Sequence, residues 1–153
     1  MRTNGQRLYT PFRIVSASFR VSFRTIQRNL HMIPRNLAPV ILKHYDFVLW
    51  LLPHLSKFPR DQKFLLGDRI ELITLDILGH LMTANYSSAR RRESLTLANL
   101  ELDKLRILAR LCKDLNLFSA KAYGYQAGAV DEIGRMIGGW LRSQAGTGVG
   151  AGA

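Results

Sequence analysis

Basic side chains are the residues of this sequence whose types and spacing could do chemistry. An arginine triplet stands at residues 90–92. Arg106, Arg110 and Lys113 recur at intervals of four and three, which is the spacing of one helical face. Cations of this kind, together with Lys121, can neutralise the phosphates of a nucleic acid in a salt-dependent way. The triplet also opposes the dipole at the start of a helix, and this conflict favours an external partner.

The alternative interpretation of this face is a solvated surface whose positive charge is diluted by acidic residues. Asp103 and Asp114 lie among the basic residues of the same segment. Composition alone does not separate phosphate binding from simple solvation, so both interpretations stay open.

Catalytic and metal-binding residues form no comparable pattern. Asp131 and Glu132 are adjacent, and neighbours in a helix point about 100° apart. Arg135 follows them at i+4 and i+3, which predicts a salt-bridge cluster instead of an acid/base pair. There is no phosphate-binding glycine loop and no nucleophile elbow. No metal-ligand spacing links the four histidines, which are His31, His44, His54 and His80. The sequence therefore predicts a protein that is not an enzyme and has no metal or cofactor.

The single cysteine, Cys112, excludes an internal disulfide and any cysteine-based metal cluster. It falls on an apolar helical stripe, which predicts a small buried hydrophobe. No segment approaches the roughly 20 apolar residues of a membrane span. We therefore expect a soluble protein without a membrane partner, and its cysteine usage fits a reducing cytoplasm.

The net charge of +11 is unevenly distributed along the 153 residues. Residues 1–36 contain seven arginines and neither lysine nor carboxylate, so this leader contributes +7. The remainder contains 15 basic and 11 acidic residues and contributes only +4.

Three interpretations of this leader remain, in order of preference. The first is that translation starts at Met32 and that the preceding residues come from upstream sequence. The second is that the leader is a basic arm that binds nucleic acid. The third is that it is an organellar transit signal, whose composition is also rich in arginine and poor in acids. In each case residues 1–31 lie outside the fold, and we expect residues 1–36 to be disordered.

Helices are the elements that must position the basic residues. The stretch 57–69 forms a corner, because Pro59 disfavours helix at Phe58 and is suited to begin the next one. Asp61 then suits the first turn of that second helix. Apolar residues at intervals of three and four predict helices at about 39–56, 59–84, 89–116 and 119–143. We expect an all-α, antiparallel up-down four-helix bundle over residues 37–144.

Each predicted helix has its own apolar stripe. In the first helix the stripe is Ile41, Tyr45, Val48, Leu52 and Leu55. In the second it is Leu66, Ile70, Ile73, Ile77 and Leu81, with further apolar surface at Leu65, Leu72, Leu75 and Leu78. In the third it is Leu95, Ala98, Leu102, Leu105, Ala109 and Cys112. The surplus on the second helix indicates either a central position or a second partner.

The fourth predicted helix has Ser119 as its N-cap and contains five glycines. Gly124 and Gly128 are four apart, as are Gly134 and Gly138, which predicts notches where a neighbouring backbone approaches. Residues 145–153 are glycine-rich, and we expect a disordered tail.

Several blocks of the sequence carry a resemblance to a known family. They are Lys57-Phe58-Pro59-Arg60 with Phe64-x-x-Gly67-x-Arg69, Leu75-Asp76-Ile77-Leu78, Ala98-Asn99-x-x-Leu102-x-Lys104-Leu105-Arg106, Arg110-Leu111-x-Lys113-Asp114-Leu115, and Glu132-Ile133-Gly134-Arg135-Met136-Ile137-Gly138-Gly139-Trp140. Together they resemble the accessory variability determinant (Avd) of diversity-generating retroelements, over about residues 42–143.

This resemblance implies a non-enzymatic four-helix bundle that assembles into a ring-like homopentamer with a basic surface. It also implies binding to the retroelement's reverse transcriptase and to RNA or DNA, in support of mutagenic retrohoming. The alternative is a structural oligomeric bundle of the wider ribosomal RNA intervening-sequence family, without a polymerase partner. Residues 78–83 stand where those proteins carry a Pro-Ala-Asn-rich ending, and this difference favours the Avd branch. The predicted nucleic-acid- or partner-binding residues are Arg90, Arg91, Arg92, Lys104, Arg106, Arg110, Lys113 and Lys121.

Overall fold

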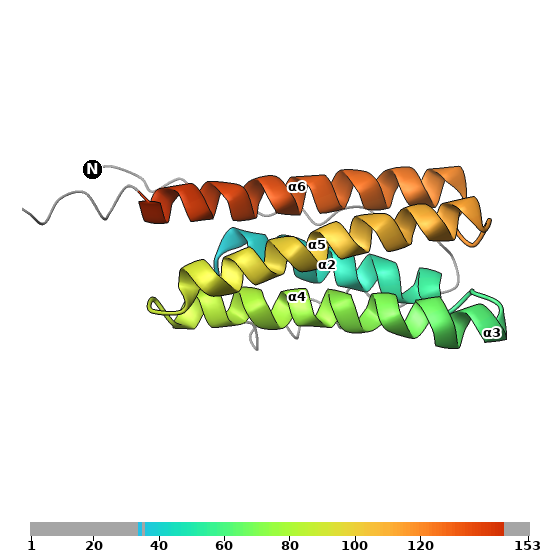
Figure 1. Ribbon diagram of the computed structural model, residues 1–153, viewed down its shortest axis with the longest axis horizontal. Helices are drawn as coiled ribbons and strands as arrows, with labels where there is room; N and C mark the ends of the chain where they lie inside the picture. The colour runs from blue at the N-terminus through green and yellow to red at the C-terminus, as the bar shows by residue number, and fades with distance from the viewer. Residues whose placement is uncertain (1–33, 35, 146–153) are drawn as a thin grey trace, which may run out of the picture. The chain divides into compact units, whose positions relative to one another are not determined.

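A computed structural model describes residue 34 and residues 36–145 of the chain. Within residues 36–145 it contains four long helices and no strand. These are α2 (Pro39–Leu55), α4 (Asp68–Tyr86), α5 (Arg91–Asp114) and α6 (Ala120–Ala145). They run up and down beside one another (Figure 1), which confirms the predicted all-α bundle. The expectations for the leader and for the tail fall almost entirely outside the described residues.

The corner between α2 and α4 is built as its sequence predicts. Pro59 caps the short helix α3 (Arg60–Gln62), and Asp61 lies in its first turn. A π-helical turn, η2 (Lys63–Gly67), then leads directly into α4. Phe58 is buried, and its ring meets Phe118 edge-on with centroids 5.1 Å apart. This aromatic contact joins the α2–α4 corner to the α5–α6 connection.

The connection between α5 and α6 is closed by backbone hydrogen bonds. Asn116 adopts a left-handed conformation with φ of 58°, which asparagine tolerates better than most residues. The N–H of Leu117 donates to the carbonyl of Cys112 at 2.8 Å, which completes a Schellman motif. Ser119 accepts a hydrogen bond from the N–H of Ala122 at 3.1 Å and is the predicted N-cap of α6.

The core of the bundle follows the apolar stripes of α4 and α5. Every residue of the predicted α5 stripe is buried, including Cys112. Burial raises the pKa of the Cys112 thiol to about 11, so this side chain is the predicted small hydrophobe and not a reactive thiolate. The buried part of the α4 stripe consists of Ile70, Ile73, Ile77 and Leu81.

The predicted stripe of α2 is wrong at two positions. Tyr45 is 42% exposed and Leu52 is only partly buried, whereas Phe47 and Leu51 are in the core. The α2 segment is apolar on more than one side, so several faces satisfy the spacing of three and four. Packing against α4 and α6 selects among those faces, and the spacing in α2 alone does not contain that information.

Three polar side chains are fully buried in this core, namely His44, Thr74 and Gln126. His44 has no exposed area, and its Nε2 donates to the carbonyl of Thr74 at 2.8 Å. Desolvation lowers the pKa of His44, so the ring is neutral at pH 7. Gln126 is also fully buried, and its side-chain amide has no hydrogen-bond partner among the described residues.

Candidate functional site

Three of the predicted binding residues on α5 are held by neighbouring groups of the chain. Two form ion pairs along α5, and the third lies over an aromatic ring of α6. The contacts are Lys104 with Glu101 (2.7 Å), Arg110 with Asp114 (3.0 Å) and Lys113 with Tyr123 (5.6 Å to the ring centroid). These cations are partly neutralised or oriented before any partner arrives.

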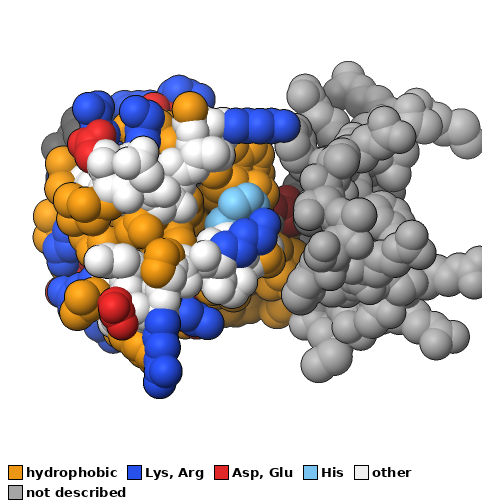
Figure 2. All heavy atoms as spheres, turned by 90° about the vertical axis from the view of Figure 1, so that its right-hand side faces the viewer, with side chains coloured by type: hydrophobic (Ala, Val, Ile, Leu, Met, Phe, Trp, Pro, Cys, Tyr) orange, Lys and Arg blue, Asp and Glu red, His pale blue; other side chains and the backbone are white. Residues whose placement is uncertain are grey.

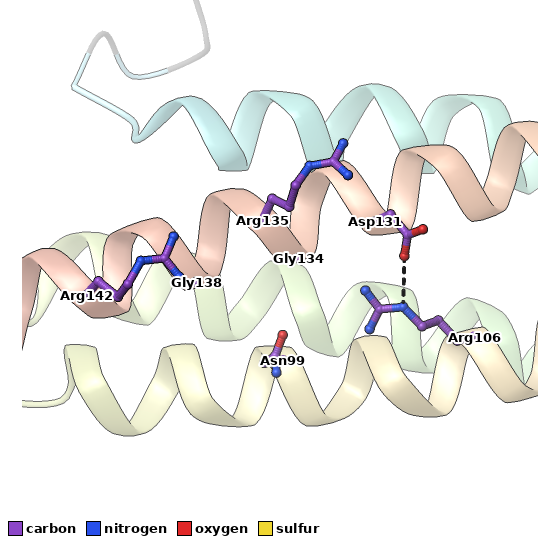
Figure 3. Close-up of a pocket in the computed structure, with 7 residues that line it drawn as sticks. All are labelled: Asn99, Arg106, Asp131, Gly134, Arg135, Gly138 and Arg142. Atoms are coloured by element: carbon purple, nitrogen blue, oxygen red, sulfur yellow. Dashed lines mark hydrogen bonds and ion pairs between the residues drawn. The ribbon is translucent and has the colours of Figure 1, made fainter.

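Arg106 is held more firmly than these three. Its Nη1 lies 2.6 Å from Asp103, and its Nε lies 3.2 Å from Asp131 of α6. The guanidinium lies over Gly134, where a Cβ atom would come within 2.8 Å of Nη2. Figure 3 shows Arg106 reaching from α5 to Asp131. The solvated-face interpretation therefore accounts for Arg106 and Arg110, each of which is paired with aspartate.

Arg91 has a structural position that its place in the arginine triplet did not indicate. Its Nε donates to the carbonyl of Ala84 at 2.8 Å, one of the free carbonyls near the end of α4. Its Nη1 donates to Gln144 at 3.4 Å, and its guanidinium lies 5.8 Å from the ring centroid of Trp140. Arg91 thus connects the ends of α4, α5 and α6.

The remaining predicted residues are exposed cations near the ends of the bundle. Arg90 and Arg92 flank Arg91 at the start of α5, and Lys121 lies in the first turn of α6. None of the three forms an ion pair with another described residue. Of the eight predicted residues, five therefore contact other groups of the chain and three form no ion pair with another described residue. The structure does not gather the eight into one site.

An open groove of about 410 Å³ lies on the surface shared by α5 and α6. Asn99 and Arg106 line it from α5. From α6 come Asp131, Gly134, Arg135, Gly138 and Arg142. In Figure 3, Asn99 and Arg106 point from α5 toward α6, and Arg142 lies along α6 beside Gly138. Arg135 projects from the side of α6 away from α5 and stands at the rim. Three arginines and one aspartate thus line this groove, and among them only Arg106 pairs with Asp131.

Glycines of α6 give the groove its floor. A Cβ atom on Gly138 would lie 3.4 Å from Nη1 of Arg142, as one on Gly134 would lie close to Nη2 of Arg106. The guanidinium groups of Arg106 and Arg142 thus lie beside the positions that Cβ atoms would occupy. The prediction that a neighbouring backbone of the bundle enters these notches is wrong, because no backbone atom is among the nearest neighbours. Gly124 and Gly128 have no atom within 4 Å of an ideal Cβ position. Their notches open to the outside.

Arg135 and Arg142 were not among the predicted binding residues. Arg135 was expected to pair with Asp131 or Glu132, but Asp131 pairs with Arg106, and Glu132 pairs with Lys43 of α2 at 2.6 Å. Among the described residues neither Arg135 nor Arg142 forms an ion pair.

A signal for these two arginines exists in the sequence as a seven-residue interval. Arg135 and Arg142 are seven apart, and so are Arg92, Asn99 and Arg106 on the antiparallel neighbour. Residues seven apart in a helix lie on nearly the same face. The interval therefore predicts one row of side chains along each of the two neighbouring helices.

Apolar side chains also reach the surface of the bundle in two rows. The outer stripe of α4 begins in η2 and consists of Leu65, Leu72 and Leu75, which continues the surplus predicted for this stretch. The outer stripe of α5 is Leu97, Leu100, Ile107 and Leu111. Apart from Leu65, each lies two positions after a buried residue and so points about 200° from the core. Figure 2 shows apolar surface between lysine and arginine side chains at the end where α2 stops and α4 begins.

The described part of the chain contains no group of three His, Cys, Asp or Glu side chains placed to hold a metal ion. None of its helices has the length and apolar character needed to span a membrane.

Comparison with known proteins identifies a family. Residues 40–144 match the family described as bAvd-like, which covers the four helices and the groove between α5 and α6. No curated protein and no solved structure gives a significant match. The match covers well over half of the chain. This chain therefore belongs to the bAvd-like family.

Proposed function

We propose that this protein is a non-enzymatic accessory protein of a diversity-generating retroelement. In this role it binds the element's reverse transcriptase and its template RNA or DNA, and it supports mutagenic retrohoming in the cytoplasm. The observation that carries the proposal is the bAvd-like match over residues 40–144, since the Avd-like family consists of accessory proteins.

The cationic surface of the bundle supports the nucleic-acid part of this proposal. Arg135 and Arg142 are exposed or lie at a groove, and they form no ion pair with another described residue. Neutralisation of phosphates by such cations releases counterions and supplies most non-specific affinity for nucleic acid. The expected affinity is therefore strongly dependent on salt.

The outer stripes of α4 and α5 support a homo-oligomer, for which we expect a pentamer. Ile107 is 72% exposed and Leu65 is 68% exposed, and both belong to rows along their helices. Rows of exposed apolar side chains such as these are a feature of surfaces that bind another protein. A closed ring of five copies needs two different patches on each copy, and the outer stripes of α4 and α5 are two such patches.

Copurification with the reverse transcriptase of the same retroelement tests the proposed function. We expect a stoichiometric complex, and we expect deletion of the accessory gene to abolish retrohoming while the reverse transcriptase is still produced. Supplying residues 32–153 in trans should restore retrohoming. Normal retrohoming in the deletion strain would contradict the proposal.

The second candidate is a structural oligomeric bundle of the ribosomal RNA intervening-sequence family. The exposed apolar stripes favour it as much as they favour the first candidate, because they predict self-association without any polymerase. A monodisperse oligomer that binds neither nucleic acid at low salt nor the reverse transcriptase would support this candidate instead.

Light scattering after gel filtration tests the oligomer. Ile107→Glu places a charge in the outer stripe of α5 and should shift the protein toward the monomer. Ser88→Glu is the matched control, because Ser88 is exposed in the α4–α5 connection, outside both outer stripes. If the two variants have the same mass as the unmodified oligomer, the outer stripe of α5 is not the interface.

A further inference from the structure

We propose that the phosphodiester backbone of a nucleic-acid strand binds in the groove between α5 and α6, with Arg135 and Arg142 as its principal contacts. The inference deepens the proposed function and depends on it, because it says where the nucleic acid lies. It also moves the site away from Arg110 and the other paired cations of α5.

The first argument concerns which cations are free to meet a phosphate. An arginine that already pairs with a carboxylate must lose that pair before it gains a phosphate, so its net contribution is small. Arg110 is in this condition, whereas Arg135 and Arg142 have no ion pair with another described residue. Arginine also binds phosphate through two parallel N–H groups, which suits both side chains to this ligand.

The second argument concerns the shape of the groove. Because Gly134 and Gly138 have no Cβ atoms, the guanidinium groups of Arg106 and Arg142 lie directly over the surface of α6, where a phosphate in the groove can meet them. The seven residues from Arg135 to Arg142 span about 10.5 Å along the helix axis. Two arginines at this separation can contact different phosphates of one single strand. Asn99 contributes an amide that can donate to a phosphate oxygen from the α5 side.

The third argument concerns Arg106, which lies in the groove but is paired. Its contacts to Asp103 and Asp131 are on a surface where the arginine side chain is 35% exposed. Each exposed ion pair of this kind changes an equilibrium constant by only about 1.4- to fivefold, so an incoming phosphate can exchange with it. We therefore assign Arg106 as a third, secondary contact that the carboxylates restrain in the absence of ligand.

Fluorescence anisotropy with a labelled single-stranded RNA of mixed sequence, measured between 0.05 and 1 M salt, tests the assignment. The variant reverses two charges, Arg135→Glu with Arg142→Glu. Loss of two contacts should reduce the slope of log K against log salt by about 1.4, at about 0.7 per contact for a single strand. Taking 1 M salt as the reference, affinity at 0.1 M should fall about 25-fold.

A matched control separates this site from the general loss of charge. Lys57→Glu with Lys63→Glu makes the same change in net charge at the α2–α4 corner, where both lysines are exposed. We expect a decrease in slope less than half as large. Circular dichroism must show the same helicity for both double variants. Arg135→Gln with Arg142→Gln provides a milder second variant if the double charge reversal impairs folding.

The outcomes distinguish this inference from the proposed function. If the unmodified protein binds the RNA and the groove variants bind equally well, the groove is wrong and the proposed function stands. If the unmodified protein binds no nucleic acid even at low salt, the nucleic-acid part of the proposed function is wrong, and this inference falls with it.

Asp131→Asn tests the role of Arg106 by a gain of binding. The substitution removes one carboxylate from the groove and releases Arg106 from its cross-helix pair. We expect affinity to rise by up to about fivefold, the equivalent of one exposed ion pair. The gain should disappear when Arg106→Gln is added. Unchanged or weaker binding by Asp131→Asn would overturn the assignment of Arg106.

Discussion

The cations of α5 and those of α6 differ more than their sequences indicate. On α5, Arg106 and Arg110 recur at helical spacing, and each is paired with aspartate. On α6, Arg135 and Arg142 are seven apart, and neither forms an ion pair with another described residue. The helix with the more obvious basic pattern therefore has fewer cations available to a ligand.

The difference shows that a basic sequence pattern does not reveal which of its cations are already paired with carboxylates. Carboxylates at i−3 and i+4, such as Asp103 and Asp114, satisfy the arginines of their own helix. Asp131 of α6 is drawn across to Arg106, and this leaves Arg135 without the partner its spacing predicted. Density of positive charge along one helix is thus a poor guide to a phosphate site unless the acidic residues are placed as well.

Within the arginine triplet, Arg91 contacts neighbouring helices whereas Arg92 is exposed, and this pair gives the largest expected difference in stability. Arg91→Ala removes a charged hydrogen bond to the carbonyl of Ala84 and the contacts to Trp140 and Gln144. We expect the free energy of unfolding to fall by about 1–3 kcal/mol. Arg92→Ala, at an exposed neighbouring position, should change it by less than about 0.5 kcal/mol. Equal effects in urea unfolding would show that Arg91 does not connect the helix ends.

Two glycines of α6 extend the comparison to the floor of the groove. Gly128 has open space at its Cβ position, so Gly128→Ala should raise the free energy of unfolding by about 0.4–1 kcal/mol. Gly134→Ala should raise it less, because Nη2 of Arg106 lies 2.8 Å from the new Cβ and must move. Thermal unfolding of the two variants measures the difference. A larger gain for Gly134→Ala would mean that Arg106 does not rest on this position.

Removal of a paired arginine should have a smaller effect on stability. Arg106→Ala breaks two exposed ion pairs, and we expect the free energy of unfolding to fall by about 0.5 kcal/mol at low salt. High salt should abolish the loss, because screening already weakens these pairs in the unmodified protein. A loss that persists in 1 M salt would mean that Arg106 acts through packing over Gly134 and not through charge.

The smallest expected effect on the free energy of unfolding is that of His44, and it appears only below neutral pH. Burial lowers its pKa in the folded state below the ordinary value of 6.5. As the pH falls through 6.5, the unfolded chain takes up a proton that the folded chain does not, so the free energy of unfolding should decrease. The decrease ends below the folded-state pKa. Urea unfolding of the unmodified protein and of His44→Gln between pH 7 and 5 isolates this contribution.

Much of the fold could be predicted because several helices have one unambiguous apolar face. The α5 stripe is strictly alternating, and all six of its residues are buried. Pro59 and Ser119 determine where helices begin through their own side chains and neighbouring backbone. Such positions can be predicted without knowing the tertiary structure. In α2 the apolar surface is wider than one face, so the choice between Tyr45 and Phe47 depended on the neighbouring helices.

The candidate site could be predicted only in part, because it is made by two helices together. The sequence identified the basic residues of α5 and the glycine spacing in α6. It did not identify the cross-helix pair of Arg106 with Asp131, which decides that Arg135 is available. Spacing within one helix cannot reveal such a pair, because its two members are 25 positions apart in the chain.

The central claim is that the phosphate site lies between α5 and α6 and not on the paired cations of α5. A salt titration of RNA binding compares Arg135→Glu with Arg142→Glu against Lys104→Glu with Arg110→Glu, two cations that pair within α5. Both double variants make the same change in net charge. We predict that the first lowers the slope of log K against log salt by about 1.4 and the second by less than half as much. The reverse order would contradict the account and return the site to α5.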